Sequence, residues 1–146
     1  MIGKGGLSLR EKWADGMSTF QGFYSRGFPN CFFMMGLQSG LTPNIPHAID
    51  VQARHLSYII EHLRDSGKST VEPREADEKS WVKLIHDGQA QSDFFETCTP
   101  GYYNNEGKPG EGEGWFGGGY PGGSEAFFQM LREWRADGTL AGLDIA

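Results

Sequence analysis

Apolar positions recur at helical spacing in the middle of the chain, between two turn signals. In the segment 45–65 they fall mostly on one helical stripe, which comprises Ala48, Val51, Leu56, Ile59, Ile60 and Leu63. Asn44 is a good N-cap just before this segment, and Gly67 is a good C′ residue just beyond it. The pattern therefore predicts an amphipathic helix from about Ile45 to Asp65.

A short, wholly apolar run lies upstream of that helix. Cys31–Met35 is bounded by the turn signal Gly27–Asn30 and by Gly36, which predicts a strand buried on both faces. Such a strand needs neighbours on both edges, and the chain offers only two weak candidates, Met17–Tyr24 and Ser69–Glu72. We therefore expect an α/β arrangement with one core strand, whose sheet is completed by another copy or by a larger enzyme.

The second half of the chain predicts two more helices around a glycine-rich segment. Pro73 suits the first turn of a helix that carries Trp81, Val82, Ile85, Phe94 and Phe95, with a possible break at Gly88. Ser124 suits the N-cap of a last helix that runs to Ala136. Between them, Thr99–Gly123 mixes glycine with spaced aromatic residues, which favours an extended segment that docks onto another surface.

Composition narrows the possible partners. The 146 residues carry a net charge of −6, which disfavours nucleic acid and anionic lipid as partners. The longest apolar run is far below the ~20 residues of a membrane helix, and the N-terminus lacks the apolar stretch of a signal peptide. Cys31 and Cys98 form no disulfide framework. These features predict a cytoplasmic protein without a membrane span.

Several motifs that could carry chemistry have simpler explanations. Gly112–Gly117 matches G-x-G-x-x-G, but no strand precedes it as a dinucleotide fingerprint requires. Gly67–Thr70 resembles the end of a P-loop, but it follows a helix, and His62 stands where a glycine is required. A helix C-cap explains Gly67 equally well.

The pattern of ionisable residues indicates neither a catalytic group nor a metal site. The histidines, which do not converge from two elements, are expected to be exposed or lightly packed: His47, His55, His62 and His86. Neither cysteine has a histidine near it in the sequence, and Cys31 is expected to be a buried small apolar residue. An acidic run is explained by the dipole of the second helix: Glu72, Glu75, Asp77 and Glu78.

The loop Gly36–Pro46 is the strongest candidate binding site. It places the polar residues Gln38, Ser39 and Asn44 after the predicted strand and before the predicted helix. Ligands of open α/β sheets bind at such positions, often at the N-terminus of the next helix. An ordinary βα loop remains the alternative.

A set of short motifs follows in order along essentially the whole chain. The motifs are Leu9-x-x-Lys12–Gly16, Thr19-Phe20-x-Gly22, Gly27–Phe32, Gly36–Ser39, Pro43-Asn44, Asp50-x-Gln52, Glu72-Pro73, Glu75-Ala76, Trp81, Cys98–Lys108, Phe116–Gly119, Trp134-Arg135-x-Asp137-Gly138 and Leu143. In their order and spacing they resemble the C-terminal part of Baeyer–Villiger-type (class B) flavin monooxygenases.

The resemblance implies a fragment of a two-dinucleotide-domain, Rossmann-like flavoprotein. Residues 1–66 would be the C-terminal portion of the FAD-binding domain, and residues 67–146 would be a helical and glycine-rich extension. In this family NADPH reduces a bound FAD, and the enzyme converts ketones to esters or lactones or oxygenates heteroatoms. The FAD and NADPH fingerprints and the catalytic arginine lie upstream in the family, so the chain alone is expected to be inactive.

The resemblance also implies cofactor contacts. Residues expected to border the flavin ring are Gln38, Ser39, Leu41, Asn44 and Ile45, and residues expected near the nicotinamide cofactor are Tyr102, Tyr103, Asn104 and Lys108. The expected partners are the FAD- and NADPH-binding portion of the enzyme and a ketone-type substrate. The alternative is a stand-alone binding module without catalytic activity, in which the glycine- and aromatic-rich segment docks a partner. A small hydrolase is a weaker alternative, because no nucleophile–base pair is found.

Overall fold

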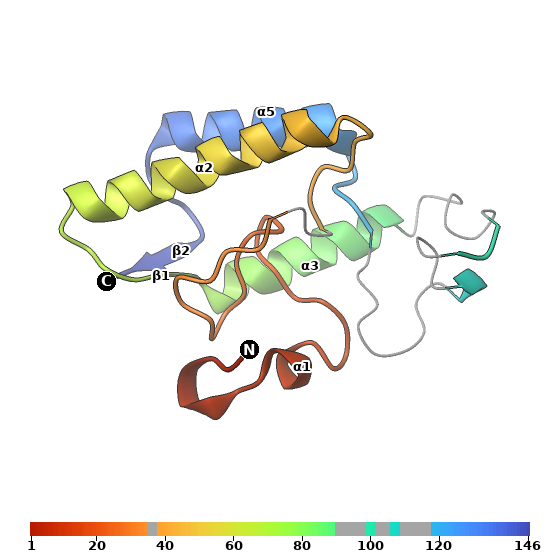
Figure 1. The fold of residues 1–146 in the computed structure, drawn as a ribbon, viewed down its shortest axis with the longest axis horizontal. Helices are drawn as coiled ribbons and strands as arrows, with labels where there is room; N and C mark the ends of the chain where they lie inside the picture. Colours follow the sequence, from red (N-terminus) through yellow and green to blue (C-terminus); the bar gives the residue numbers. More distant parts are fainter. Residues whose placement is uncertain (35–37, 90–98, 102–105, 109–117) are drawn as a thin grey trace.

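Three long helices enclose an irregular N-terminal segment. The computed structural model describes residues 1–34, 38–89, 99–101, 106–108 and 118–146. Helices α2 (Ile45–Asp65) and α5 (Gly123–Asp137) lie side by side, and α3 (Glu75–Gln89) lies across from them, with the chain after α1 (Leu9–Lys12) running between the two layers (Figure 1). A short 3₁₀ turn, Lys4–Gly6, precedes α1.

The sheet in the described residues has only two strands. β1 (Val71–Pro73) pairs antiparallel with β2 (Leu143–Ile145), in a register that sets Val71 opposite Ile145. The backbone N–H groups of Ser69 and Thr70 continue this pairing by donating to the carbonyl oxygen of Ala146, at 2.8 and 2.9 Å. The last residues of the chain are therefore fixed against its middle.

Helix α2 has the bounds that its apolar stripe predicts. The Asn44 side chain caps its start by accepting a hydrogen bond from the His47 N–H at 3.3 Å. Gly67 follows the C-cap residue Ser66 with a φ of +68°, the left-handed conformation that favours glycine. The helix cap, and not a phosphate-binding loop, thus accounts for Gly67.

The predicted core strand is wrong over its described part. Residues 31–34 form no strand, and Met35 lies outside the described residues. Cys31 donates its N–H to Phe28 in a turn, and Phe33 donates to the Phe23 carbonyl at 2.8 Å. Because neither bond is continued into a ladder, the apolar run packs as irregular chain. Its Cys31 side chain is half-buried, not enclosed as expected.

The other predicted elements shift by a few residues. Met17–Tyr24 contains a single bridge between Phe20 and Tyr24 in place of a strand. Pro73 ends β1 and does not open α3. Phe94 and Phe95 lie outside the described residues. Helix α5 is capped at Gly122, two residues before the predicted cap, and its C-cap residue is Gly138, with a φ of +72°.

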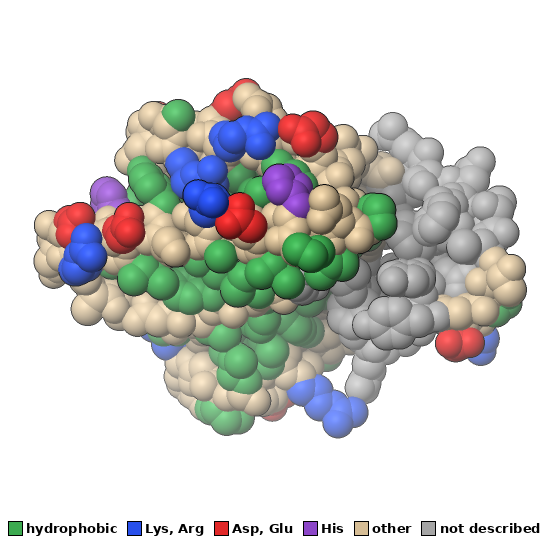
Figure 2. All heavy atoms as spheres, turned by 45° about the horizontal axis from the view of Figure 1, so that its top comes forward, with side chains coloured by type: hydrophobic (Ala, Val, Ile, Leu, Met, Phe, Trp, Pro, Cys, Tyr) green, Lys and Arg blue, Asp and Glu red, His purple; other side chains and the backbone are tan. Residues whose placement is uncertain are grey.

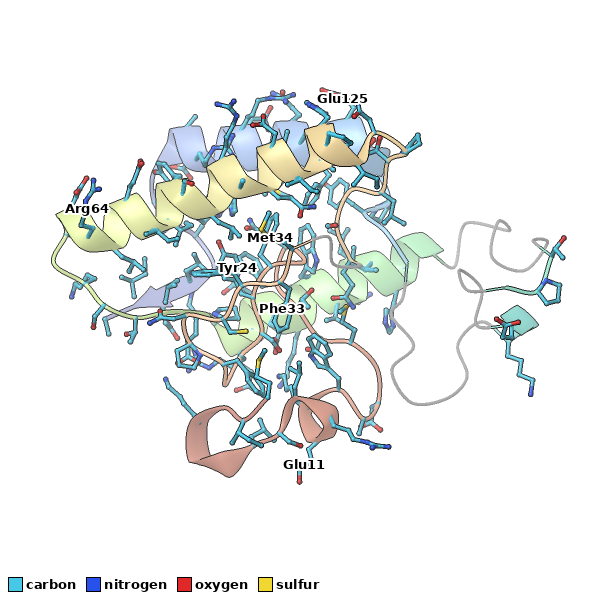
Figure 3. All side chains as sticks on the ribbon, viewed as in Figure 1. Glu11, Tyr24, Phe33, Met34, Arg64 and Glu125 are labelled. Carbon is cyan, nitrogen blue, oxygen red and sulfur yellow. The ribbon has the colours of Figure 1, made fainter. Side chains whose placement is uncertain are left out.

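A tight aromatic turn, Thr19–Ser25, fills the space between the helices. Phe23 stacks on His55 of α2 at a ring distance of 5.0 Å, and it also packs against Phe127 of α5 at 6.1 Å. Phe20 meets the edge of Trp81 of α3 at 6.1 Å. The turn therefore contacts all three long helices, and Tyr24 lies in the middle of the molecule (Figure 3).

Backbone geometry makes this turn compact. Phe20 and Tyr24 exchange backbone hydrogen bonds of 2.8 and 3.2 Å across it. Gln21 and Gly22 both have positive φ, +55° and +75°. A Cβ at Gly22 would lie 2.9 Å from the Cβ of Ser39, so the loop that follows residue 37 can approach only because position 22 is glycine.

His55 is fully buried, which corrects the expectation of an exposed or lightly packed histidine. Its Nε2 lies 3.2 Å from the hydroxyl oxygen of Tyr24, and its Nδ1 has no partner among the described residues. Burial, with a smaller effect from Arg135, lowers the pKa of His55 to about 3. Burial also raises the pKa of Tyr24. Both side chains are therefore neutral in the folded state at pH 7.

Two buried carboxylates hold the N-terminal segment against β1 and α3. Glu78 accepts a hydrogen bond from Lys12 Nζ at 2.7 Å and another from the Arg26 backbone N–H at 2.7 Å. Glu72 accepts hydrogen bonds from the Lys4 ammonium and from the Gly27 N–H. The helix dipole alone does not explain these carboxylates, because they are the anchors of a segment more than 40 residues distant in sequence.

Glu78→Gln should destabilise the chain markedly. The substitution keeps the shape but leaves Lys12, which is itself mostly buried, without its counter-charge. Removing one partner of a buried ion pair costs about 3 kcal/mol. Urea unfolding followed by tryptophan fluorescence measures the loss. The control is Glu75→Gln, whose carboxylate pairs with Lys79 at an exposed position and should be nearly silent; equal effects would contradict the anchoring role.

The pH dependence of stability should carry the signature of His55. Because its folded-state pKa lies below the unfolded value of 6.5, the unfolded chain binds the proton first as pH falls. Stability should therefore fall below pH 6.5, by up to about 1.4 kcal/mol per pH unit. His55→Phe should flatten this slope in denaturant titrations between pH 6.5 and 5, whereas the exposed His86→Gln should keep it. An unchanged slope in His55→Phe would contradict the assignment.

Candidate functional site

The candidate loop is held in place by two backbone hydrogen bonds to residues 118–120 and by close packing against α5. The Gln38 N–H donates to the Gly118 carbonyl at 2.8 Å, and the Ser39 carbonyl accepts from the Tyr120 N–H at 2.9 Å. A Cβ at Gly40 would lie 2.9 Å from Phe127 of α5. Residues 38–40 are all buried, so the neighbouring segments enclose this part of the loop.

The Gln38 side chain bonds inward, to the N-terminal segment. Its Oε1 accepts from the Thr19 hydroxyl at 2.6 Å and from the Thr19 N–H at 3.2 Å. Its Nε2 donates to the Met17 carbonyl at 2.8 Å. Gln38 is fully buried and has a φ of +65°. Its amide thus ties the loop to the aromatic turn, and a strained backbone conformation is maintained by these bonds.

Trp81 of α3 also contacts the loop. Its indole N–H donates to the Gln38 carbonyl at 3.1 Å, and its ring stacks on Tyr120 with centroids 5.6 Å apart. Gly119 runs directly over the loop, because a Cβ there would lie 3.0 Å from the Leu41 side chain. The segment 118–120 and α3 together clamp the loop between them.

Beyond Gly40 the loop turns outward into the start of α2. Leu41 and Ile45 expose 47% and 43% of their surface, which is unusual for large apolar side chains in a folded domain. Asn44 is exposed, and its side-chain oxygen is used as the helix cap. The five flavin residues suggested by the sequence therefore divide into a buried pair, Gln38 and Ser39, and an exposed group at the helix start.

The start of α2 offers few free N–H groups. Pro46 has none, and the His47 N–H is taken by the Asn44 side chain. The next amide, that of Ala48, bonds to the Asn44 carbonyl at 3.1 Å. The helix start would therefore act on a ligand mainly through the electrostatic field of its dipole, and less through hydrogen bonds from its N–H groups.

The expected nicotinamide contacts are mostly beyond the described structure. Tyr102, Tyr103 and Asn104 lie outside the described residues, as does the G-x-G-x-x-G match at 112–117. Lys108 is described and exposed. The predicted contacts of this segment remain predictions.

The described residues show neither a metal-binding cluster nor an activated thiol. They contain no group of three or more His, Cys, Asp or Glu side chains that could hold a metal ion. Burial raises the pKa of the Cys31 thiol, which disfavours the reactive thiolate. Within the same ranges, no helix is long and apolar enough to cross a membrane.

Comparison with curated proteins gives relatives along the whole chain. It is 44% identical over 146 residues to a pentalenolactone D synthase of Streptomyces arenae, covering 99% of this chain and 25% of that protein. Identity is 37% to a Baeyer–Villiger monooxygenase of Stachybotrys chlorohalonatus and 35% to an FAD-binding monooxygenase of Hypomyces subiculosus, with 23% and 24% of those proteins covered. No protein-family model matches the sequence.

Solved structures give the same result. The polycyclic ketone monooxygenase of Thermothelomyces thermophila superposes with a TM-score of 0.84 at 32% identity, over 99% of this chain and 24% of that one. A steroid monooxygenase bound to NADP shares the fold with a TM-score of 0.79 at 22% identity, with 99% and 25% covered.

Fold and comparisons together define the chain as a segment of an α/β flavoprotein. More particularly, it is homologous from end to end to the C-terminal part of Baeyer–Villiger-type flavin monooxygenases. It spans about a quarter of the length of the curated relatives that it matches.

Some residues that shape the site were missed or misjudged from the sequence. Glu78 was explained by the helix dipole, although it shares a helical stripe with Trp81 and Ile85, which signals burial. His55 likewise falls four residues after Val51 and four before Ile59, both buried. In contrast, nothing in the local pattern around Gln38 indicates that Thr19 is its partner.

Gln38→Leu should loosen the loop and lower stability. The substitution leaves the Thr19 N–H and the Met17 carbonyl buried without partners, and unsatisfied buried groups cost about 1–3 kcal/mol each. We expect the midpoint of urea unfolding to fall accordingly. Gln129→Leu, at an exposed position of α5, is the matched control and should change stability little. If the two variants were equally stable, the Gln38 amide would not tie the loop to the aromatic turn.

Proposed function

We propose that this chain is the cofactor-bordering C-terminal part of an FAD- and NADPH-dependent monooxygenase that converts ketones to esters or lactones, or oxygenates heteroatoms. The observation that carries the proposal is the relationship to such enzymes along the whole chain, at up to 44% identity. Because the chain spans about a quarter of those relatives, it should not be active alone. Residues 1–66 would complete the FAD domain, with a Rossmann-like fold, and residues 67–146 would extend it.

The chain's own contribution would be to place one wall of the flavin site. Gln38 and Ser39 would position the loop without touching the flavin, because their described bonds fix the loop to Thr19 and Tyr120. Leu41 and Ile45 would face the flavin, since an exposed apolar side chain suits a flat aromatic ring. Asn44 would fix the start of α2, which lies between Leu41 and the rest of the helix, by capping its first turn.

The chemistry of this wall fits a flavin. When bound, FAD would carry the electrons from NADPH to oxygen, which protein side chains cannot do. The N-terminus of α2 would favour negative charge near it through the helix dipole, worth about 0.3–1 kcal/mol at an exposed end. Leu41 and Ile45 would exclude water from the same place. Tyr102, Tyr103, Asn104 and Lys108 would line the nicotinamide side.

An apolar face supports the view that a further part of the enzyme covers this chain. Figure 2 shows apolar side chains gathered in a band alongside α2. The exposed large apolar residues on and near this helix are Met34, Leu41, Ile45, Ile49 and Ile60. Contiguous apolar surface of this kind marks an interface in soluble proteins. The proposed occupant is the FAD- and NADPH-binding portion of the same enzyme.

A chimera tests the proposal directly. This chain replaces the corresponding quarter of the FAD-binding monooxygenase of Hypomyces subiculosus, which is 35% identical to it over 146 residues. After gel filtration the chimera should keep a visible flavin spectrum and oxidise NADPH. The chain alone, mixed with FAD, should keep none. A well-folded chimera without flavin would overturn the proposal, and flavin retained by the chain alone would favour a self-sufficient binding module.

A matched pair of variants locates the wall within the chimera. Ile45→Asp should weaken FAD retention about 10-fold or more, because it sets a buried charge against the ring; such a loss equals about 1.4 kcal/mol. Leu84→Asp changes a similarly exposed large apolar side chain on α3, outside this apolar face, and should leave FAD retention unchanged. Equal FAD affinities in the two variants would remove Ile45 from the flavin site.

A further inference from the structure

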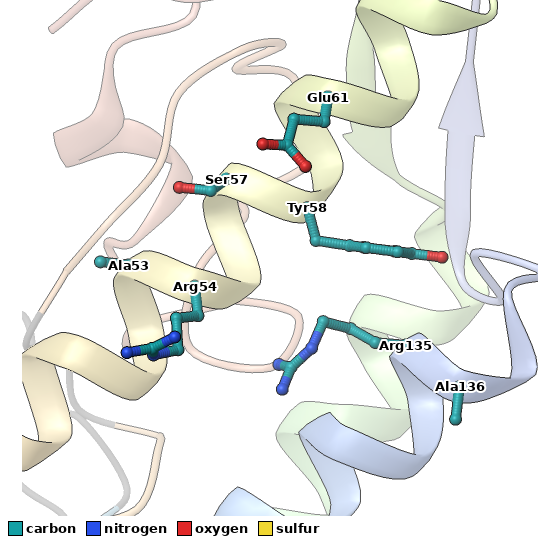
Figure 4. Close-up of a pocket in the computed structure, with 7 residues that line it drawn as sticks. All are labelled: Ala53, Arg54, Ser57, Tyr58, Glu61, Arg135 and Ala136. Carbon is teal, nitrogen blue, oxygen red and sulfur yellow. The ribbon is translucent and has the colours of Figure 1, made fainter.

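A cleft separates the outer faces of α2 and α5, away from the loop at the start of α2. Its volume is about 590 Å³, and it is broadly open to solvent. Arg54, Ser57, Tyr58 and Glu61 of α2 line one wall, and Arg135 of α5 lines the other (Figure 4). The proposed flavin wall uses none of these residues.

Arg135 differs from the neighbouring arginines in its lack of a counter-charge. Arg54 pairs with Asp50 at 2.8 Å, and Arg132 pairs with Glu125 at 3.0 Å. Arg135 has no ion pair or hydrogen bond within the described residues, and its Nη1 atom is buried without a partner. Such a guanidinium nitrogen is costly to leave unpaired.

The surroundings of Arg135 favour an anion, and not only a water molecule, as the partner of its guanidinium. Partial burial, followed by the positive charges of Arg132 and Arg54, lowers the pKa of Arg135 against a smaller opposing effect of Tyr58. Figure 4 shows its guanidinium directed into the cleft, toward the wall formed by α2. An incoming oxyanion would relieve this repulsion by pairing with the guanidinium nitrogens other than the buried Nη1.

Glu61 is the only carboxylate that lines the cleft among the described residues, and it does not neutralise Arg135. The Tyr58 ring lies between the two side chains (Figure 4). No ion pair joins them. The cleft therefore has a positive side at Arg135 and Arg54, and a negative side beyond Tyr58.

We propose that this cleft binds a small molecule through a phosphate-type oxyanion held by Arg135, with Arg54 as the second cation. The planar fork of a guanidinium matches two oxygens of such a group. The Ser57 hydroxyl, on the same wall, is available as a further donor. The cleft has room for more than the anion, and the face of Tyr58 is available to the rest of the ligand.

A small ligand fits better than a polyanion such as nucleic acid. The chain has a net charge of −6, so an extended phosphate backbone would be repelled over most of its length. The carboxylates Asp50 and Glu125 flank the arginines and confine the positive charge to the cleft. This site is independent of the proposed monooxygenase function, because it needs neither flavin nor the remaining enzyme.

Calorimetric titration of the 146-residue chain with pyrophosphate and with inorganic phosphate, at constant ionic strength, tests the site. We expect saturable binding of pyrophosphate, at least 10-fold weaker in Arg135→Gln and 2- to 5-fold tighter in Glu61→Gln. Arg64→Gln is the control, since Arg64 is exposed on the same helix and pairs with Asp65 outside the cleft. Chloride at matched ionic strength should not compete.

Three results would overturn the proposal: equal affinity in Arg135→Gln and Arg64→Gln, equal competition by chloride, or no saturable binding. Near-ultraviolet circular dichroism checks that each variant is folded. If Arg135→Gln fails to fold, Arg135→Lys decides, because it keeps the charge but loses the fork. Weakened binding in Arg135→Lys would support the proposal, and unchanged binding would contradict it.

Discussion

The packing of one irregular turn between three helices determines most of this structure. Phe20, Phe23 and Tyr24 project from a few consecutive residues and reach α3, α5 and α2, so the helices are arranged around the turn more than around one another. Aromatic side chains of this size supply in one turn the apolar area that a sheet would otherwise provide. The turn can be this tight because Gly22 has a positive φ and carries no Cβ. The Gln38 amide and the two buried carboxylates are all attached to this turn or to the chain beside it.

Periodic features of the sequence predicted structure well, whereas features that depend on distant partners did not. Helix α2 follows its apolar stripe and its caps, since both are local properties. The apolar run from Cys31 predicted a strand, but a strand exists only where a second strand can pair with it, and the described residues offer none there. Polar residues on apolar stripes, such as His55 and Glu78, could have been found from spacing alone. Their position on the apolar stripe of the helix was the available signal, because that stripe is the buried face.

The same distinction holds for the candidate site. The sequence proposed the loop before α2 as the site, and the ordered motifs along the chain pointed to the family that the comparisons bear out. It could not divide the loop into its two roles. The Gln38 amide bonds to residues 19 and 21 positions away, and Trp81 is 43 positions away, so neither contact has a local signature. Pro46, in contrast, is visible in the sequence and already implies that the start of α2 has one fewer N–H donor.

The pairing of β1 with β2 has a consequence for how the chain is made. Val71 lies opposite Ile145, so a segment in the middle of the chain waits for a partner more than 70 residues later. Contacts of such long range form slowly, because the intervening chain must first be ordered. During synthesis the ribosome still holds residue 145 long after residue 71 has emerged. The edge of β1 therefore stays open until residues 143–145 have also emerged, and this interval is when a chaperone would have most to protect.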